Sequence, residues 1–399
     1  MTKRFFLNLL FTCFSFTYCF AQQSSVIWIN EHALPIDGDN QTKYLAYLAD
    51  QLKGNTICGL AEASHGTHEF SVEKTHIINY LIRHENYKSI GFEFGHSPMV
   101  AINNYLQTGQ GDLKQLMKAL RLFDNQEIFE LFQSIKAYND AQAPASKVAL
   151  FGFDTDYFAS DIAASALYCS KYLIANPQLY TNTKAALPVL DKIAAPGDNN
   201  LYDLSDSETG AIGSLNNEVK VKSSSAEFKK RLSLLYQGTL GSNPLARDEF
   251  MAENIADFQQ ANKAKTIIWG HNLHLAKDTT MAQCKAMGYY VRKTYGKQYY
   301  AIGFDTFKGS VTVMDGDEFV KHNFETKPAS FSAVFANAKF PAFFIAFSNA
   351  YGDPFYNVTN NITNIYANWG NSGTLPMRPG IDFDGLIFIK ETTASIPLN

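Results

Sequence analysis

The sequence predicts an α/β fold with a mostly parallel central sheet and flanking helices, and three observations lead to that prediction. Short apolar runs without polar alternation recur along the chain, as they do in strands that are covered on both faces. Amphipathic helical stretches separate these runs, as crossover connections would. The first four runs each end in acidic or histidine side chains, at the place where open α/β sheets bind ligands.

The predicted strands and helices alternate from residue 56 onward. Ile77, Ile78, Leu81 and Ile82 form one helical stripe, and a second runs from Ile128 to Ile135, with the spacing that puts side chains on one helix face. Strands are expected at 56–60, 89–92, 148–153 and 266–269, and later ones, some antiparallel at the sheet edge, at 299–304, 311–314, 343–347 and 386–389.

Residues 157–264 are predicted to be a helical insertion that forms a lid or a subdomain over the carboxyl ends of the strands. The stretch is far longer than the roughly dozen residues that a crossover needs. Helices are expected at 159–175 and 226–236, and a third begins after Asn243, which can cap it with Pro244 at the first position. The segment Pro196–Ser225 is rich in Gly, Asn, Asp and Ser and is predicted to be a long loop.

Composition excludes several classes of protein. The chain of 399 residues is 46% hydrophobic and 18% charged, with 34 Lys and Arg against 38 Asp and Glu. It is therefore neither disordered nor fibrous. The weakly acidic balance argues against nucleic-acid binding, because phosphate contacts need a surplus of positive charge.

The first 21 residues predict a signal peptide. Lys3 and Arg4 precede a Phe- and Leu-rich run that ends at Phe20, and Ala21 offers the small residue that a signal peptidase reads. The apolar run is short for a membrane span, and no second one follows. We expect cleavage near Ala21, a secreted or periplasmic protein without a stable membrane anchor, and one α/β domain over residues 22–399.

Glu62, His65, His68 and Glu69 lie just after the first predicted strand. A carboxylate beside an imidazole can hold its tautomer and raise its basicity, so His65 is a candidate general base with Glu62 as its partner. The alternative is a loop whose polar side chains only cap the next helix. Two carboxylates and two histidines within eight residues exceed what capping requires.

Acidic side chains also follow the next two predicted strands. Glu93 stands between two aromatic residues, where an unpartnered acid would cost several kcal/mol, so either a functional role or a buried ion pair would explain it. His96 could simply begin the following turn. Asp154 and Asp156 follow the third strand, and a helix cap would explain one of them.

His271 and His274 follow the fourth predicted strand and can meet one ligand if the loop folds back. We expect a functional role for His271, whereas His274 is either a supporting or a structural residue.

Signatures of several other site types are absent from the sequence. It contains no Gly-x-Ser-x-Gly nucleophile elbow, no credible dinucleotide fingerprint and no Walker loop. It also lacks His-x-x-x-His and Cys-x-x-Cys pairs. We therefore expect no cofactor and a small-molecule substrate, whereas the sequence leaves the oligomeric state open.

These motifs, in this order, resemble the erythromycin esterase family. The resemblance covers nearly the whole mature chain. It lies in Glu62–Phe70, Gly91-Phe92-Glu93, Gly152-Phe153-Asp154, Arg247-Asp248 with Met251–Asn254, His271-Asn272 with His274, and Phe383–Ile387.

The resemblance implies hydrolysis of a carboxylic ester, in some members the ring ester of a macrolide lactone, without a covalent serine intermediate. His65 looks like the base that activates water, with Glu62 and Glu93 orienting the base and the water. His271 would polarise the carbonyl or protonate the leaving alkoxide. Supporting or substrate-binding roles would then fall to Arg247 on the inserted helix and to His68, Glu69, Asp154 and His274.

Two other functions fit the same residues. A metal-dependent hydrolase could bind one or two zinc ions through His65, His68, His271 and His274 together with Glu62 and Glu93. An exported protein without catalytic activity could instead use the pocket to bind haem or another ligand.

Overall fold

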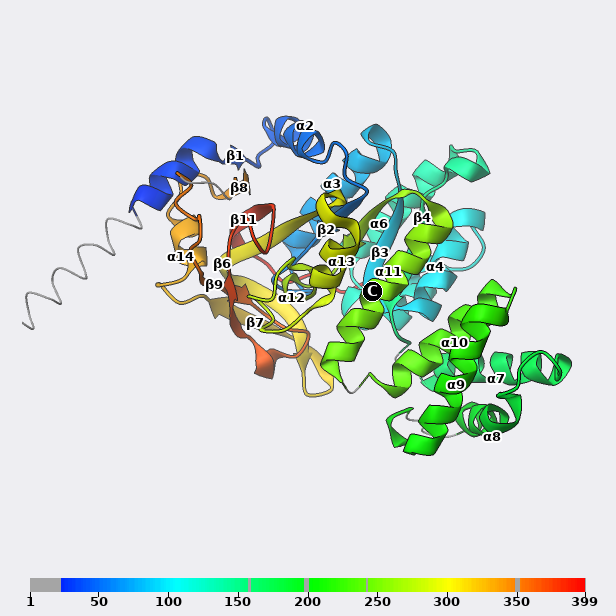
Figure 1. Ribbon diagram of the computed structural model, residues 1–399. Helices are drawn as coiled ribbons and strands as arrows, with labels where there is room; N and C mark the ends of the chain where they lie inside the picture. Colours follow the sequence, from blue (N-terminus) through cyan, green and yellow to red (C-terminus); the bar gives the residue numbers. More distant parts are fainter. Residues whose placement is uncertain (1–22, 157–158, 197–200, 242, 349–351, 399) are drawn as a thin grey trace, which may run out of the picture. The chain divides into compact units, whose positions relative to one another are not determined.

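The computed structural model describes residues 23–156, 159–196, 201–241, 243–348 and 352–398 (Figure 1). The signal peptide predicted for residues 1–21 therefore lies outside the described residues. The chain divides into two compact units. The first contains residues up to 90 together with 112–148 and 264–399, and the second contains 91–111 and 149–263.

A sheet whose inner strands are parallel forms the centre of the first unit. Its strand order is β1-β8-β11-β6-β2-β5. Strand β7 pairs with β6 as well and is not part of this order. The inner pairs β11–β6, β6–β2 and β2–β5 are parallel, whereas β1–β8, β8–β11 and β6–β7 are antiparallel. This confirms the predicted α/β class with antiparallel strands at the edge. The bounds are Leu34–Pro35 for β1, Ile57–Leu60 for β2, Lys265–Trp269 for β5, Tyr299–Asp315 for β6, Glu318–Glu325 for β7, Ala342–Ala346 for β8 and Gly385–Thr392 for β11.

Strand β6 corrects the prediction of two separate strands at 299–304 and 311–314, because one continuous strand covers both. Its first part pairs with β2 and its last part with β7. Gly309 lies near the start of the part that pairs with β7 and has a φ of +149°, and a Cβ there would lie 1.9 Å from the carbonyl oxygen of Thr392. Glycine therefore lets the strand pass close to β11 and continue, where the sequence pattern suggests a break.

Helices of the first unit bury the predicted stripes. Helix α3 (His68–His84) packs against α6 (Gln126–Asp140), and the inward residues Ile77, Ile78, Leu81 and Ile82 are buried. The shorter or more peripheral helices are α2 (Gln41–Gln51), α5 (Leu113–Met117), α12 (Asn272–Leu275), α13 (Met287–Tyr295) and α14 (Phe331–Ala336). A two-stranded ribbon of β9 (Asn360–Asn364) and β10 (Gly373–Met377) completes this unit.

In the second unit, helices pack on strand β4 (Ala149–Asp154). Strand β3 (Tyr87–Gly95) begins in the first unit and ends in the second. Helices α4 (His96–Thr108) and α11 (Pro244–Asn262) both contact β4. The predicted start of α11 is confirmed, because the side chain of Asn243 accepts a hydrogen bond from the Leu245 amide.

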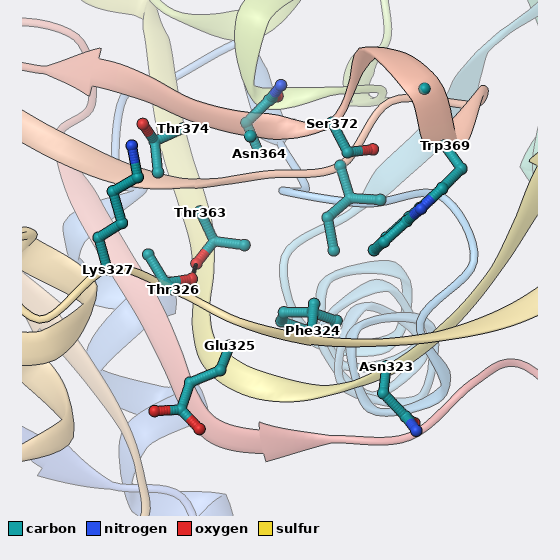
Figure 2. A pocket seen from close by; sticks show the side chains of 13 residues that line it. Asn323, Phe324, Glu325, Thr326, Lys327, Thr363, Asn364, Trp369, Ser372 and Thr374 are labelled. Carbon is teal, nitrogen blue, oxygen red and sulfur yellow. Dashed lines mark hydrogen bonds between the residues drawn. The ribbon is translucent and has the colours of Figure 1, made fainter.

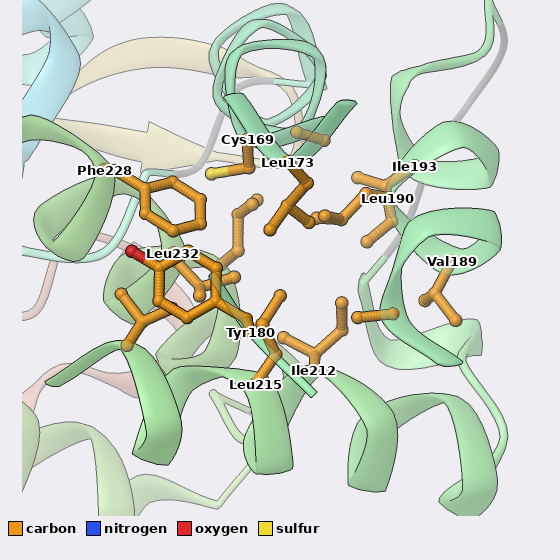
Figure 3. Packing of buried hydrophobic residues seen from close by; sticks show 14 of the residues in the cluster. Cys169, Leu173, Tyr180, Val189, Leu190, Ile193, Ile212, Leu215, Phe228 and Leu232 are labelled. Carbon is orange, nitrogen blue, oxygen red and sulfur yellow. The ribbon is translucent and has the colours of Figure 1, made fainter. Parts of the chain in front are cut away.

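Helices α7 (Ala159–Ala175), α8 (Thr183–Ala194), α9 (Asp206–Lys222) and α10 (Ala226–Thr239) share a hydrophobic core of their own. Figure 3 shows the aromatic and aliphatic side chains that meet between these helices. Among them are Cys169, Leu173, Leu190, Leu215 and Phe228. These four helices therefore bury their apolar side chains against one another.

Helix α9 shows that the long loop predicted for Pro196–Ser225 is wrong. Ser205 and Glu208 form a capping box that satisfies amides of the first turn. Gly213, one of the residues behind the Gly-rich composition, is a packing residue, because a Cβ there would lie 2.8 Å from the Tyr236 ring of α10. Composition suggested a loop, but the three- and four-residue spacing of the buried Ile212, Leu215, Asn216 and Val219 is helical.

In the part of the chain that the structure describes, none of the helices has the length and apolar character needed to span a membrane.

Asp305 on β6 is fully buried and leads to a prediction about pH and stability. Its carboxylate accepts a hydrogen bond of 3.1 Å from the Thr363 amide. Burial raises the pKa of Asp305 from 3.8 to about 7, although hydrogen bonds from Ser332, Thr306 and Thr363 lower it. The folded state therefore binds a proton that the unfolded chain releases, so this group reduces stability as the pH rises from about 4 to about 7.

We expect Asp305→Asn to remove this part of the pH dependence. The difference in unfolding free energy between variant and wild type should be roughly 2–3 kcal/mol larger at about pH 8 than at about pH 5. Urea denaturation at the two pH values measures both differences. The prediction is wrong if the two differences are equal.

Candidate active site

Glu62 lies just beyond β2 and is bound on both carboxylate oxygens. Oε1 is 2.6 Å from Nδ1 of His65. Oε2 accepts hydrogen bonds from Lys74 Nζ at 2.6 Å and from Trp269 Nε1 at 2.9 Å. The side chain is 1% exposed, so these three donors replace the water that would otherwise solvate the carboxylate.

Lys74 supplies the positive charge that makes this burial possible. It extends from α3, is fully buried, and its Nζ lies 4.2 Å from the centroid of the Trp269 ring. Burial by itself would raise the pKa of Glu62, but the charge of Lys74 and the contact with His65 outweigh burial and lower it. Glu62 is therefore an ionised carboxylate at neutral pH.

The contact with Glu62 sets the tautomer of His65. An ionised carboxylate can only accept a hydrogen bond, so Nδ1 carries the proton and the neutral ring has its lone pair on Nε2. The ring packs edge-on against Phe123, with ring centroids 5.5 Å apart. The side chain is 11% exposed, so a small part of it is open to solvent. His65 is thus arranged to accept a proton at Nε2.

His271 lies beside His65, with ring centroids 5.4 Å apart. It is the N-cap of α12, and its Nδ1 accepts a hydrogen bond of 3.3 Å from the Leu273 amide. The neutral ring therefore carries its proton on Nε2, where it can act as a donor. Tyr366 stacks on the His271 ring, at 5.4 Å between centroids and 23° between the ring planes.

Asn272 fixes the His271 segment to the same sheet edge as Glu62. Its amide donates to the carbonyl oxygen of Glu62 at 2.8 Å. Its side chain donates to the carbonyl oxygen of Phe304 on β6, also at 2.8 Å. The segments that follow β2 and β5 are thus joined directly by backbone contacts. His274, one turn further along, is buried, and its amide donates to the carbonyl oxygen of His271.

His68 and Glu69 contact the carboxyl-terminal segment of the chain. The His68 ring lies 2.5 Å from Glu127 Oε1, and Glu127 accepts the amide of Ile396. Glu69 accepts the amide and the hydroxyl of Thr393, each at 2.7 Å. These contacts attach the end of the chain to α3 and α6, and they account for both residues without a substrate. The supporting roles expected for them stay predictions.

Glu93, Asp154 and Arg247 form an ion-pair group within the second unit. Arg247 Nε donates to Asp154 Oδ2 at 3.1 Å, and one of its terminal nitrogens lies 3.4 Å from Glu93 Oε1. Asp154 is buried, so the guanidinium provides the partner that a buried acid needs. The catalytic role of Glu93 and the supporting roles of the other two residues stay predictions, because the ion pairs explain their burial.

Asp156 caps a helix, although not the helix that follows it in sequence. Its two oxygens accept the amide and the hydroxyl of Ser97 in the first turn of α4, each at 2.7 Å. His96 is at the start of the same helix. Burial, together with the charges of Lys230 and Arg231, lowers the pKa of His96 to about 3, so this histidine is neutral at physiological pH.

Four residues that contact Glu62 or the two histidines were not predicted as site residues: Lys74, Phe123, Asn272 and Tyr366. A signal for Lys74 was present in the sequence: it lies four residues after Phe70 and three before Ile77, on the buried stripe of α3. A lysine at a core position requires an anionic partner. Phe123 and Tyr366 gave no such signal, because segments far apart in sequence bring them to the site.

Within the described ranges there is no group of three or more His, Cys, Asp or Glu side chains arranged to hold a metal ion.

Comparison with known proteins identifies relatives along most of the chain. A family model described as erythromycin esterase matches residues 82–392. The chain is 26% identical to the putative hydrolase YbfO of Bacillus subtilis over 87% of this chain and 88% of that protein. It is 22% identical to erythromycin esterase type II of Escherichia coli, covering 67% and 73% of the two chains.

The fold also matches a solved structure. An erythromycin esterase mutant in its open conformation superposes with a TM-score of 0.68 at 15% identity, covering 90% of this chain and 96% of the other. At this identity the match supports the fold alone.

The Glu62–Lys74 pair leads to a stability prediction. We expect Lys74→Met to lower the free energy of unfolding by about 3–5 kcal/mol at neutral pH, because it leaves a buried carboxylate without its cation. Adding Glu62→Gln should recover much of that loss, since the amide is neutral. Urea denaturation of the two single variants and the double variant measures the coupling.

Lys53→Met is the matched control, because Lys53 forms its ion pair with Asp50 at the surface. It should leave the unfolding free energy nearly unchanged. Strictly additive effects of Lys74→Met and Glu62→Gln would contradict the proposed coupling.

Proposed function

Because this chain belongs to the erythromycin esterase family, we propose that it hydrolyses a carboxylic ester through a water molecule activated by His65, without a serine nucleophile. The observation that carries the proposal is the contact of ionised Glu62 with Nδ1 of His65 at 2.6 Å. That contact leaves the basic lone pair on Nε2, as a general base requires.

In the proposed reaction, His65 Nε2 takes a proton from water while the water oxygen attacks the ester carbonyl carbon. The tetrahedral intermediate carries its negative charge on the former carbonyl oxygen. His271, with its proton on Nε2, would donate a hydrogen bond to that oxygen, a contribution that strengthens as the charge develops. The proton held by His65 then leaves with the alkoxide, and the products are a carboxylic acid and an alcohol.

Glu62 and Lys74 would act through His65 rather than on the substrate. Glu62 uses both oxygens on His65, Lys74 and Trp269, which makes it a positioning residue. It holds the imidazole in one tautomer and offsets the positive charge that forms when the ring is protonated. Lys74 keeps Glu62 ionised, because it lowers the pKa of a carboxyl that burial alone would raise.

A lactone is a reasonable first substrate to test. The Escherichia coli relative is named an erythromycin esterase, so macrolide lactones belong in an ester panel together with simple alkyl and aryl esters.

The mechanism predicts that His65→Gln lowers kcat/KM by about 10²–10⁴-fold on any ester that the wild type cleaves. His84→Gln is the matched control, because it changes an exposed histidine at the far end of α3 and should retain wild-type turnover. Steady-state kinetics of the three proteins decide between these outcomes. Unchanged turnover in His65→Gln would exclude His65 as the base.

Three further measurements separate this mechanism from a zinc hydrolase, a covalent mechanism and a ligand-binding protein. We expect a chelator to leave the rate unchanged, whereas a zinc hydrolase would lose activity that zinc restores. A single turnover in ¹⁸O-labelled water should place label in the acid with no acyl-enzyme in the mass spectrum. A tight complex without turnover would favour a ligand-binding protein instead.

We also propose that the protein is exported, on the strength of Lys3, Arg4 and the apolar run that follows. Expression of the full chain in a bacterial host should give a mature protein that starts at Gln22, as read by amino-terminal sequencing. A variant lacking residues 2–21 should stay in the cytoplasm. Recovery of the uncleaved chain in the cytoplasmic fraction would contradict export.

A further inference from the structure

Tyr366 contacts the candidate active site, but the reaction proposed above does not use it. The residue follows β9 and is half-buried. Its ring stacks on His271, with centroids 5.4 Å apart and planes 23° from parallel. His271 in turn lies beside His65, also at 5.4 Å between ring centroids. A single ring therefore separates Tyr366 from the proposed base.

Hydrogen bonds on both sides of Tyr366 fix its backbone. The amide of the preceding residue, Ile365, donates to the carbonyl oxygen of Ala63 at 2.8 Å, in the loop that follows β2. The carbonyl oxygen of the following residue, Ala367, accepts the Met314 amide of β6, also at 2.8 Å. Tyr366 is therefore anchored both to the central sheet and to the loop of the proposed base, which is the kind of support that holds a catalytic group in position.

The side chain of Asn364 holds the hydroxyl of Tyr366. Residues two apart in an extended segment point to the same side, so Asn364 and Tyr366 share one face. Figure 2 shows the side chains of Thr363 and Asn364 leaving β9 on opposite sides. Asn364 is 2% exposed, and its side chain hydrogen-bonds Tyr366. Its Oδ1 has no hydrogen-bond partner among the described residues, so the atom that bonds Tyr366 is Nδ2.

The direction of this hydrogen bond determines what the hydroxyl can still do. An amide nitrogen only donates, so the Tyr366 oxygen is the acceptor and its own proton is left for another partner. Burial raises the pKa of Tyr366 and outweighs the hydrogen bond from Asn364, which lowers it. The hydroxyl therefore keeps its proton at neutral pH and is a hydrogen-bond donor.

The proposed hydrolysis requires donors of this kind. The tetrahedral intermediate carries a negative charge on the former carbonyl oxygen, and that oxygen has lone pairs for more than one hydrogen bond. Donors placed at a developing oxyanion are usually the largest single contribution to acyl transfer, and tyrosine and histidine are among the side chains that serve. In the reaction proposed above, only His271 has this role.

Given the ester hydrolysis proposed above, on which this assignment rests, we propose that the Tyr366 hydroxyl donates a second hydrogen bond to the oxyanion, beside that of His271. No covalent bond to Tyr366 forms or breaks, and the proton stays on its oxygen. Stacking on His271 brings the two donors onto neighbouring rings, and Asn364 keeps the phenol oxygen in one place. Tyr366 is thus a further catalytic residue of the same site.

Tyr366→Phe tests the proposal, because it removes the hydroxyl and keeps a ring against His271. On an ester that the wild type cleaves, we expect kcat to fall about 10²-fold while KM changes by less than about threefold, since the donor acts mainly in the transition state. A phosphonate analogue of that ester, which resembles the tetrahedral intermediate, should lose affinity by a similar factor. Thermal unfolding verifies that the variant is folded at the assay temperature.

Two further variants separate the hydroxyl from the ring. Tyr366→Leu removes both and should be at least as slow as Tyr366→Phe. If Tyr366 acted only by stacking on His271, Tyr366→Phe would retain wild-type turnover and Tyr366→Leu alone would be slow. Tyr356→Phe is the matched control, because Tyr356 is 44% exposed and should retain wild-type kcat and phosphonate affinity.

Wild-type kcat in Tyr366→Phe would overturn this proposal, as would a slow variant that binds the phosphonate as tightly as the wild type does. In either case a large loss of activity in His65→Gln would leave the proposed hydrolysis standing. Full turnover in both Tyr366→Phe and His65→Gln, or a wild type that cleaves no ester, would overturn the two proposals together.

Discussion

The buried ion pair between Glu62 and Lys74 is the interaction on which the candidate site depends. A carboxylate that is 1% exposed would ordinarily take up a proton, and a neutral acid could donate to an imidazole instead of accepting from it. The fully buried ammonium of Lys74, 2.6 Å away, prevents this and lowers the pKa of Glu62. The tautomer of His65, and with it the position of the basic lone pair, follows from that one charge. A residue on the core face of α3 thus determines what a histidine on a loop can do.

Backbone hydrogen bonds from several segments of the chain fix the loop that contains Glu62. The carbonyl oxygen of Glu62 accepts the Asn272 amide, and that of Ala63 accepts the Ile365 amide. Gly66 accepts amides from both Thr312 and Ser395, and a Cβ at Gly66 would lie 1.7 Å from the Thr312 carbonyl oxygen. The loop is therefore part of a hydrogen-bonded layer rather than a mobile connection. Such support is what holds a catalytic group at a fixed position.

Two buried acids of this protein show how the surroundings shift the pKa of a carboxyl group. Glu62 has a lysine beside it and a lowered pKa. Asp305 is bound by hydroxyl and amide donors, and its pKa rises to about 7 because burial outweighs them. Two acids of similar burial thus have pKa values shifted in opposite directions, and only the spatial partners distinguish them.

The sequence by itself determined the α/β class, the stripes of α3 and α6, the capped start of α11, and the clustering of acids and histidines after strand ends. These features depend on local periodicity, on capping chemistry and on motifs, and all of them lie within short segments. The prediction was wrong where the local signal was ambiguous. A loop was expected around Gly213, but this residue lies in α9 and packs against Tyr236 of α10. Two strands were expected on either side of Gly309, but this residue lies within the one long strand β6.

Only the tertiary structure decided which charged and aromatic side chains contact each other. The pairing of Lys74 with Glu62, the approach of Phe123 and Tyr366 to the two histidines, and the attachment of His68 and Glu69 to the end of the chain join segments far apart in sequence. Burial and electrostatic contact depend on distance in space. The spacing of two residues along the chain determines that distance only within a helix, a strand or a tight turn.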